Sequence, residues 1–162
     1  MRIVFMGTPA FGVPSLTALC EAGHQVVGVF TQPDRPRGRG NKLTASPVKE
    51  EALARGIPVY QPEKIRVESV EALRALKPEL CVTAAFGQLL SQELLDIPRY
   101  GTVNVHASLL PKHRGSAPVA WSLIMGDERT GVTTMLTEKG LDTGPMLLKA
   151  ETEILPEDDC GS

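Results

Sequence analysis

The sequence predicts an α/β fold built on a doubly wound, mostly parallel sheet, with an antiparallel strand near the C-terminal end. Short aliphatic runs alternate with segments that carry the caps and apolar spacing of helices, an order typical of βα repeats. The run Leu80–Ala85 is predominantly apolar, as expected for a strand covered on both faces. The chain has 162 residues, 42% of them hydrophobic and 22% charged, so it is long enough for one domain with its own core.

In the first half of the chain, strands and helices are expected to alternate. The predicted strands are Arg2–Met6, Gln25–Thr31, Ile57–Tyr60 and Leu80–Ala85. The predicted helices are Pro14–Glu21, Pro47–Arg55 and about 67–76. Ser46 is a suitable N-cap, and Pro47 suits the first helical position. Gly23 and Gly56 mark the ends of the first two helices, and Pro78 stops the third.

The second half continues the pattern with a different ending. Further strands are expected at Thr102–His106, Val132–Thr137 and Met146–Ile154, and helices near Ser91–Leu95 and at Pro118–Met125. The last two strands are joined by a glycine-containing turn at residues 139–144, so we expect them to be antiparallel.

Composition excludes several classes of protein. A net charge of −2 argues against a protein coated for nucleic acid, and the apolar runs are too short to span a bilayer. Met1 begins a strand without a signal-peptide layout, which predicts a cytoplasmic protein. The cysteines, Cys20, Cys81 and Cys160, lack the spacing of a metal site or disulfide framework. The segment at Gly7–Gly12 lacks the dinucleotide-binding spacing, so a tight strand-to-helix turn is the better explanation of Gly7.

A basic segment interrupts the regular pattern between Gln32 and Pro47. It contains three prolines, two glycines and four cations without periodicity, which predicts a long exposed loop. The cations Arg35, Arg37, Arg39 and Lys42 fall within eight residues, a density that suits phosphate groups. A solvated surface loop without a ligand is the alternative.

The most informative strand ends with two polar side chains. Asn104 and His106 alternate with valines and share one face of the strand, near the carboxyl edge where α/β sheets bind ligands. Histidine exchanges protons near neutral pH, and an asparagine amide can donate to a developing oxyanion. Asp142, in the turn at 139–144, could orient the imidazole. The pattern suits acyl or formyl transfer; the alternatives are a strand end that caps its own loop and an Asx-turn at Asp142.

These residues belong to a longer stretch that resembles a known family. The run N-V-H-A-S-L-L-P-K-H-R-G at 104–115, followed by G-L-D-T-G at 140–144, is similar to the folate-dependent formyltransferases. The resemblance covers essentially the whole chain and implies a Rossmann-like formyltransferase fold. G-T-P-A-F at 7–11 and F-T-Q-P-D-R-P-R-G-R-G at 30–40 resemble the members that formylate methionyl-tRNA.

The resemblance implies a role for each matching position, with 10-formyltetrahydrofolate as co-substrate and no metal. The catalytic residues would be Asn104, His106 and Asp142. The folate-binding residues would be Ser108, Leu109, Leu110, Pro111, Phe86, Gly87, Leu90 and Gly140. Initiator methionyl-tRNA would contact Arg39 and Lys42, supported by Arg35 and Arg37.

The resemblance also implies a larger protein and leaves rivals open. Members that act on tRNA carry a second, β-barrel domain, so we expect residues 1–162 to be a truncated catalytic domain of a protein that is monomeric at full length. Exposed apolar surface is then expected on this chain. The rivals are a formyltransferase acting on a nucleotide-linked amino sugar, a formyltetrahydrofolate hydrolase-type domain, the glycinamide-ribonucleotide enzyme, and a non-catalytic RNA- or folate-binding module.

Overall fold

The computed structural model describes residues 1–138 and 144–162, which form two compact units. The first unit comprises Met1–Val103 and the second Asn104–Ser162. No helix in the described parts of the chain is both long enough and apolar enough to cross a membrane.

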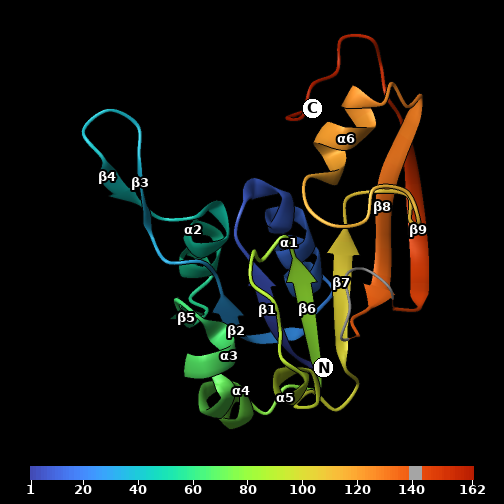
Figure 1. Ribbon diagram of the computed structural model, residues 1–162. Helices are drawn as coiled ribbons and strands as arrows, with labels where there is room; N and C mark the ends of the chain where they lie inside the picture. Colours follow the sequence, from blue (N-terminus) through green and yellow to red (C-terminus); the bar gives the residue numbers. More distant parts are fainter. Residues whose placement is uncertain (139–143) are drawn as a thin grey trace. The chain divides into compact units, whose positions relative to one another are not determined.

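A parallel sheet forms the centre of the first unit, with strand order β5-β2-β1-β6 (Figure 1). The strands are β1 (Arg2–Gly7), β2 (Gln25–Phe30), β5 (Val59–Tyr60) and β6 (Leu80–Ala84). All three pairings are parallel, which confirms the predicted sheet type. Because β1 pairs with β2 on one side and with β6 on the other, the strand order reverses there. Ligands of open α/β sheets bind at the carboxyl ends of strands at such a reversal.

The crossover helices of this unit follow the predicted order with small shifts. They are η1 (Ala10–Gly12), α1 (Val13–Glu21), α2 (Pro47–Ala54), α3 (Ile65–Glu68), α4 (Val70–Leu76) and α5 (Gln92–Leu95). Ser46 caps α2 as predicted, since its hydroxyl accepts the backbone N–H of Lys49 at 3.1 Å.

The core of the first unit is aliphatic and aromatic. Its largest fully buried side chains include Phe5 and Phe30, and Phe30 stacks on Tyr60 with ring centroids 4.8 Å apart. Gly7 lies opposite Ala84 where β1 and β6 end. A Cβ atom on Gly7 would lie 2.8 Å from the carbonyl oxygen of Ala84 and 2.8 Å from Cε1 of Phe5. Close packing of the two strands therefore explains this glycine.

Two predicted elements of the first unit differ in the structure. The single helix expected at about 67–76 is two helices, because Ser69 between them has a non-helical backbone (φ −120°, ψ 4°). The first begins early, at Ile65, whose N–H donates to Oε1 of Gln88 at 2.7 Å. The strand expected at 57–60 is limited to Val59–Tyr60, since Pro58 has no N–H to donate.

The basic segment is a β-hairpin, so the prediction of an irregular loop was wrong. β3 (Arg35–Arg37) and β4 (Lys42–Thr44) pair antiparallel and extend away from the parallel sheet (Figure 1). Pro36 is accommodated because a two-stranded ribbon leaves alternate backbone groups free of the ladder. Gly38, Gly40 and Asn41 turn the chain with φ values of 70°, 87° and 48°.

The second unit contains a helix and a long antiparallel strand pair. β7 (Thr102–His106) crosses the boundary between the units, and α6 (Pro118–Ile124), β8 (Arg129–Leu136) and β9 (Met146–Glu153) follow. β8 and β9 are antiparallel, as predicted, and pair from Arg129 opposite Glu153 to Met135 opposite Met146, with a shift of register between Thr134 and Met135. Every residue of β9 is exposed, and the apolar ones include Met146, Leu147 and Leu148.

Candidate active site

The end of β7 places His106 against the loop that follows it. His106 is buried, and its Nε2 lies 2.9 Å from the carbonyl oxygen of His113. A carbonyl oxygen only accepts hydrogen bonds, so Nε2 is the donor in this contact. Asn104 lies two residues earlier on the same strand and is half-buried. The structure thus brings one predicted catalytic residue into a defined hydrogen bond at the strand end.

The loop from Ser108 to Pro111 is held by hydrogen bonds to β8 and β9. Thr133 Oγ1 donates to the carbonyl oxygen of Ser108 at 2.7 Å and accepts the N–H of Leu110 at 3.2 Å. Lys149 Nζ donates to the carbonyl oxygen of Leu110. The Leu110–Pro111 peptide bond is cis. The predicted folate-binding residues of this loop therefore form one braced turn.

Within that turn the four side chains differ in accessibility. Ser108 and Leu110 are buried, and the Ser108 hydroxyl donates to the carbonyl oxygen of Lys112 at 2.7 Å. Leu109 is half-buried and Pro111 is exposed. Ser108 and Leu110 thus shape the turn, whereas Leu109 and Pro111 present accessible side-chain surface.

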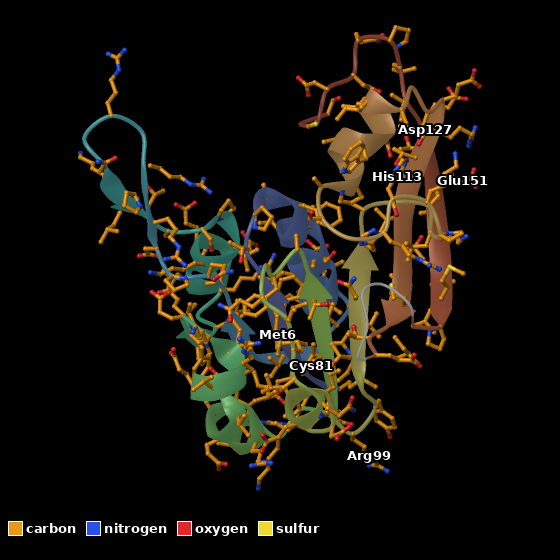
Figure 2. All side chains as sticks on the ribbon, in the orientation of Figure 1. Met6, Cys81, Arg99, His113, Asp127 and Glu151 are labelled. Atoms are coloured by element: carbon orange, nitrogen blue, oxygen red, sulfur yellow. The ribbon has the colours of Figure 1, made fainter. Side chains whose placement is uncertain are left out.

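His113 and Asp127 are functional candidates that the sequence did not reveal. His113 Nε2 lies 2.7 Å from Asp127 Oδ2; both residues are labelled in Figure 2. Lys112 Nζ lies 3.7 Å from Asp127 Oδ1. The hydrogen bond from His113, with Lys112 nearby, holds the pKa of Asp127 below its ordinary value. Fourteen residues separate the pair, and only the folded loop brings them together.

The loop after β6 carries the predicted folate residues of the first unit. Phe86 is buried, and its carbonyl oxygen accepts the Thr8 hydroxyl at 2.8 Å. Gly87 adopts a φ of 90°, and a Cβ atom there would lie 2.8 Å from Nε2 of Gln32. Gln32 Nε2 donates to the Gly87 carbonyl oxygen at 3.0 Å. Leu90 is half-buried against the core.

Hydrogen bonds join the base of the basic hairpin to the rest of the first unit, while the cations of the hairpin are exposed. Asp34 bonds Lys49 Nζ at 2.9 Å and Gln61 Nε2 at 2.7 Å, and Thr31 and Ser46 join their hydroxyls at 2.7 Å. The Lys49 hydrogen bond lowers the pKa of Asp34. The exposed predicted tRNA residues are Arg35, Arg37, Arg39 and Lys42. Of these, Arg35 forms a 3.6 Å ion pair with Glu63.

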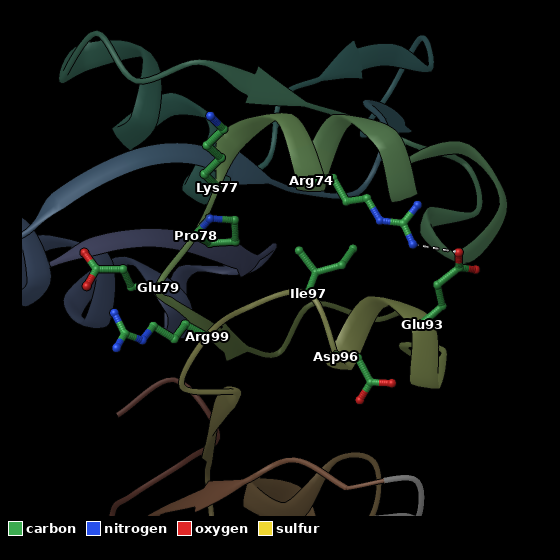
Figure 3. A pocket seen from close by; sticks show the side chains of 8 residues that line it. All are labelled: Arg74, Lys77, Pro78, Glu79, Glu93, Asp96, Ile97 and Arg99. Atoms are coloured by element: carbon green, nitrogen blue, oxygen red, sulfur yellow. Dashed lines mark hydrogen bonds and ion pairs between the residues drawn. The ribbon is translucent and has the colours of Figure 1, made fainter.

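Two predicted site residues, Asp142 and Gly140, lie outside the described residues. Elsewhere, a surface hollow of about 580 Å³ in the first unit contains none of the predicted site residues (Figure 3). Its charged residues are Arg74, Lys77, Arg99, Glu79, Glu93 and Asp96. Cations and anions are mixed there, and Arg74 already pairs with Glu93 at 3.1 Å. The residues of the structure outside 139–143 contain no cluster of three or more His, Cys, Asp or Glu placed to hold a metal ion.

Comparison with known proteins decides the family. The family model described as formyl transferase matches residues 1–162. The chain belongs to the formyl transferase family. This confirms the family that the motif at 104–115 and the turn sequence at 140–144 resemble.

Curated proteins of known name are similar in sequence to this formyl transferase chain. It is 59% identical over 162 residues to a methionyl-tRNA formyltransferase of Trichlorobacter lovleyi and 58% identical over 162 residues to one of Bacillus subtilis. Each comparison covers 99% of this chain and 51% of the relative. The chain therefore spans about half the length of the curated relatives it matches.

Solved structures show the fold of this formyl transferase. The phosphoribosylglycinamide formyltransferase of Bacillus halodurans superposes with a TM-score of 0.81 at 22% identity, covering 99% of this chain and 84% of that one. A formyltetrahydrofolate deformylase of Pseudomonas syringae gives a TM-score of 0.77 at 17% identity, over 99% of this chain and 53% of that one. At these identities the likeness confirms the predicted Rossmann-like formyltransferase fold, and it does not distinguish substrates.

Proposed function

We propose that the full-length protein transfers a formyl group from 10-formyltetrahydrofolate to the α-amine of methionyl initiator tRNA, in the cytoplasm, for translation initiation. The observation that carries this proposal is the identity of 59% and 58% to two proteins named methionyl-tRNA formyltransferase, along the whole of this chain. The polar end of β7 and the exposed basic hairpin supply chemistry that suits the same reaction.

The reaction needs a stabilised oxyanion and a route for one proton. The amine attacks the formyl carbon, a new N–C bond forms, and negative charge collects on the formyl oxygen. The bond from that carbon to N10 of the folate then breaks, and N10 regains a proton. We assign stabilisation of the oxyanion to Asn104 and His106, because preorganised donors lower such barriers strongly. Asp142 would hold and polarise His106 and help to move the amine proton through water.

No covalent intermediate on the protein is part of this proposal. Holding the amine beside the formyl donor converts a reaction between two partners into one within a complex, and this alone lowers the barrier. The proposed folate contacts of the second unit are Leu109 and Pro111, the accessible side chains of the braced turn. Those of the first unit are Phe86, Gly87 and Leu90, in the loop that follows β6. Gly140 is a further proposed folate contact.

The basic hairpin supports RNA as the second substrate. Its cations are exposed, whereas Asp34, the one anion in the segment, is already bonded to Lys49 and Gln61. Asp34 therefore does not neutralise the cations of the ribbon. Arg35 pairs with Glu63 at 3.6 Å, but both side chains are exposed, so the positive charge of the ribbon can bind phosphates. Arg39 and Lys42 are the principal candidates for contacts with the tRNA, with Arg35 and Arg37 in support.

The decisive experiment follows labelled formyl from 10-formyltetrahydrofolate with the full-length protein. Charged initiator tRNA is the test acceptor, and uncharged tRNA and a nucleotide-linked amino sugar are the controls. We expect label on charged initiator tRNA alone. Label on the sugar would identify the sugar as the acceptor, and release of formate would identify water as the acceptor. Binding of tRNA without any turnover would identify a non-catalytic RNA-binding module instead.

A further inference from the structure

The backbone at His113 has an unusual conformation that presents its carbonyl oxygen to His106. Residue 113 has a φ of 53°, in the left-handed region that only a few per cent of residues other than glycine adopt, asparagine, aspartate and histidine more often than the rest. Its carbonyl oxygen lies 2.9 Å from Nε2 of His106. Such conformations persist only where surrounding contacts hold them.

The side chain of the same residue supplies such a contact. His113 Nε2 donates to Asp127 Oδ2 at 2.7 Å, and both side chains are largely shielded, with exposures of 16% and 15%. Asp127 follows α6, where its own N–H donates to the carbonyl oxygen of Ser122 at 3.0 Å. The imidazole of His113 is thus hydrogen-bonded to the turn between α6 and β8.

The contact with the carbonyl oxygen also determines which tautomer of His106 is stable. Because a carbonyl oxygen cannot donate, Nε2 of His106 must carry hydrogen, and in the neutral ring Nδ1 is then the basic nitrogen. We propose that Asp127 and His113 are positioning residues that hold the residue-113 carbonyl against His106 and thereby fix its Nε2–H tautomer. The significance for catalysis rests on the proposed function, which makes His106 a catalytic residue.

The structural part is tested without any substrate. Long-range ¹H–¹⁵N correlation spectra of the full-length protein, recorded at alkaline pH, report which nitrogen of His106 carries hydrogen. We expect Nε2–H in the wild type. Asp127→Ala should give a mixture of tautomers, whereas Asp127→Asn should retain the wild-type spectrum because its amide oxygen still accepts from His113. His113→Asn should also retain it, since asparagine tolerates the left-handed region and can donate to Asp127.

Kinetics separate positioning from substrate binding. Asp127→Ala should lower kcat about tenfold, the lower end of the range known for residues that orient metal-binding histidines, which we take as a guide. The KM for 10-formyltetrahydrofolate should stay within about twofold, because neither positioning residue is assigned to the folate. Asp127→Asn should recover most of kcat. The matched control is Lys112→Ala, which removes the neighbouring cation but leaves the hydrogen bond between His113 and Asp127.

Each outcome bears on the proposal. An Nδ1–H tautomer in wild-type His106 would overturn it, and this measurement does not depend on how any variant folds. An unchanged His106 spectrum and unchanged kcat in folded Asp127→Ala would overturn it as well. If the spectra respond as expected but the protein transfers no formyl group, the positioning pair stands and the proposed function fails.

Discussion

At the scale of single residues, burial controls the chemistry of Cys81. Burial raises the pKa of its thiol to about 12, and a hydrogen bond with Thr102 opposes this shift only in part. Between pH 9 and 12 the folded protein therefore keeps a proton that the unfolded chain releases. The free energy of unfolding must fall as pH rises through this window.

That dependence can be measured against a variant. The slope of the unfolding free energy against pH should be steeper in the wild type than in Cys81→Ala, by up to about 1.4 kcal/mol per pH unit. Denaturant titrations at several pH values between 9 and 11 supply the slopes. Equal slopes would show that the thiol titrates alike in both states.

The space around Gly7 is too small for a larger residue. In Gly7→Ala the added methyl meets the Ala84 carbonyl oxygen at 2.8 Å, and backbone at the end of two core strands cannot withdraw easily. We expect a loss of about 1–3 kcal/mol in the free energy of unfolding, measured by denaturant titration. Gly161→Ala is the control, because its nearest neighbour is the side-chain oxygen of Asp159 at 3.3 Å, and it should change stability by less than about 0.5 kcal/mol.

His106 carries the sharpest prediction about activity. In the full-length protein, His106→Ala should reduce kcat for formyl transfer by about 10² or more, as when a general acid–base group or oxyanion donor is lost. Folate affinity, measured by fluorescence or calorimetry, should be retained. Near-normal turnover would remove His106 from the catalytic assignment.

The residue types at the site could be predicted from the sequence, but part of their environment could not. Asn104 and His106 are detectable because polar residues end an otherwise apolar strand. The partnership of His113 with Asp127 depends on a left-handed backbone at a residue that is not glycine. Side-chain identity alone gives no signal for that conformation.

At the scale of elements, the β3–β4 hairpin should contribute to RNA binding through charge. Arg39→Ala in the full-length protein should weaken tRNA binding and reduce the slope of log K against log salt by about 1, because one fewer counterion is released. Filter binding at several salt concentrations gives the slope. Arg66→Ala on α3, another exposed cation of the first unit, is the matched control and should leave the slope unchanged.

Elements were predicted well where periodicity and capping agree, and less well where a single residue alters the backbone. Ser46 and Pro47 located the start of α2 correctly. The hairpin was missed because its prolines indicate a break, whereas a ribbon outside the main sheet accommodates Pro36. Ser69 divides one predicted helix into two through a backbone angle that its side chain does not reveal.

At the scale of the whole molecule, exposed apolar side chains predict self-association of the 162-residue chain. The side chains of Ile124 on α6 and Leu148 on β9 are 70% and 74% exposed. Met125 and Leu147 are also exposed and enlarge the apolar surface. Sedimentation velocity should show mass increasing with concentration. The double variant Ile124→Lys/Leu148→Lys should reduce association more than Val67→Lys, which changes an equally exposed apolar residue on α3. A monomer at every concentration, with a sharp unfolding transition, would contradict this.

The hydrogen bonds at the base of the hairpin have a consequence for protein engineering. These hydrogen bonds are formed by Thr31, Asp34 and Ser46. At the turn of the hairpin, a Cβ atom added to Gly38 or Gly40 would meet no neighbouring atom within 4 Å. We therefore expect that the ribbon between these residues can be lengthened, shortened or exchanged while the parallel sheet stays intact. Grafting ribbons of different charge onto this scaffold would test whether the ribbon helps to select the proposed RNA acceptor.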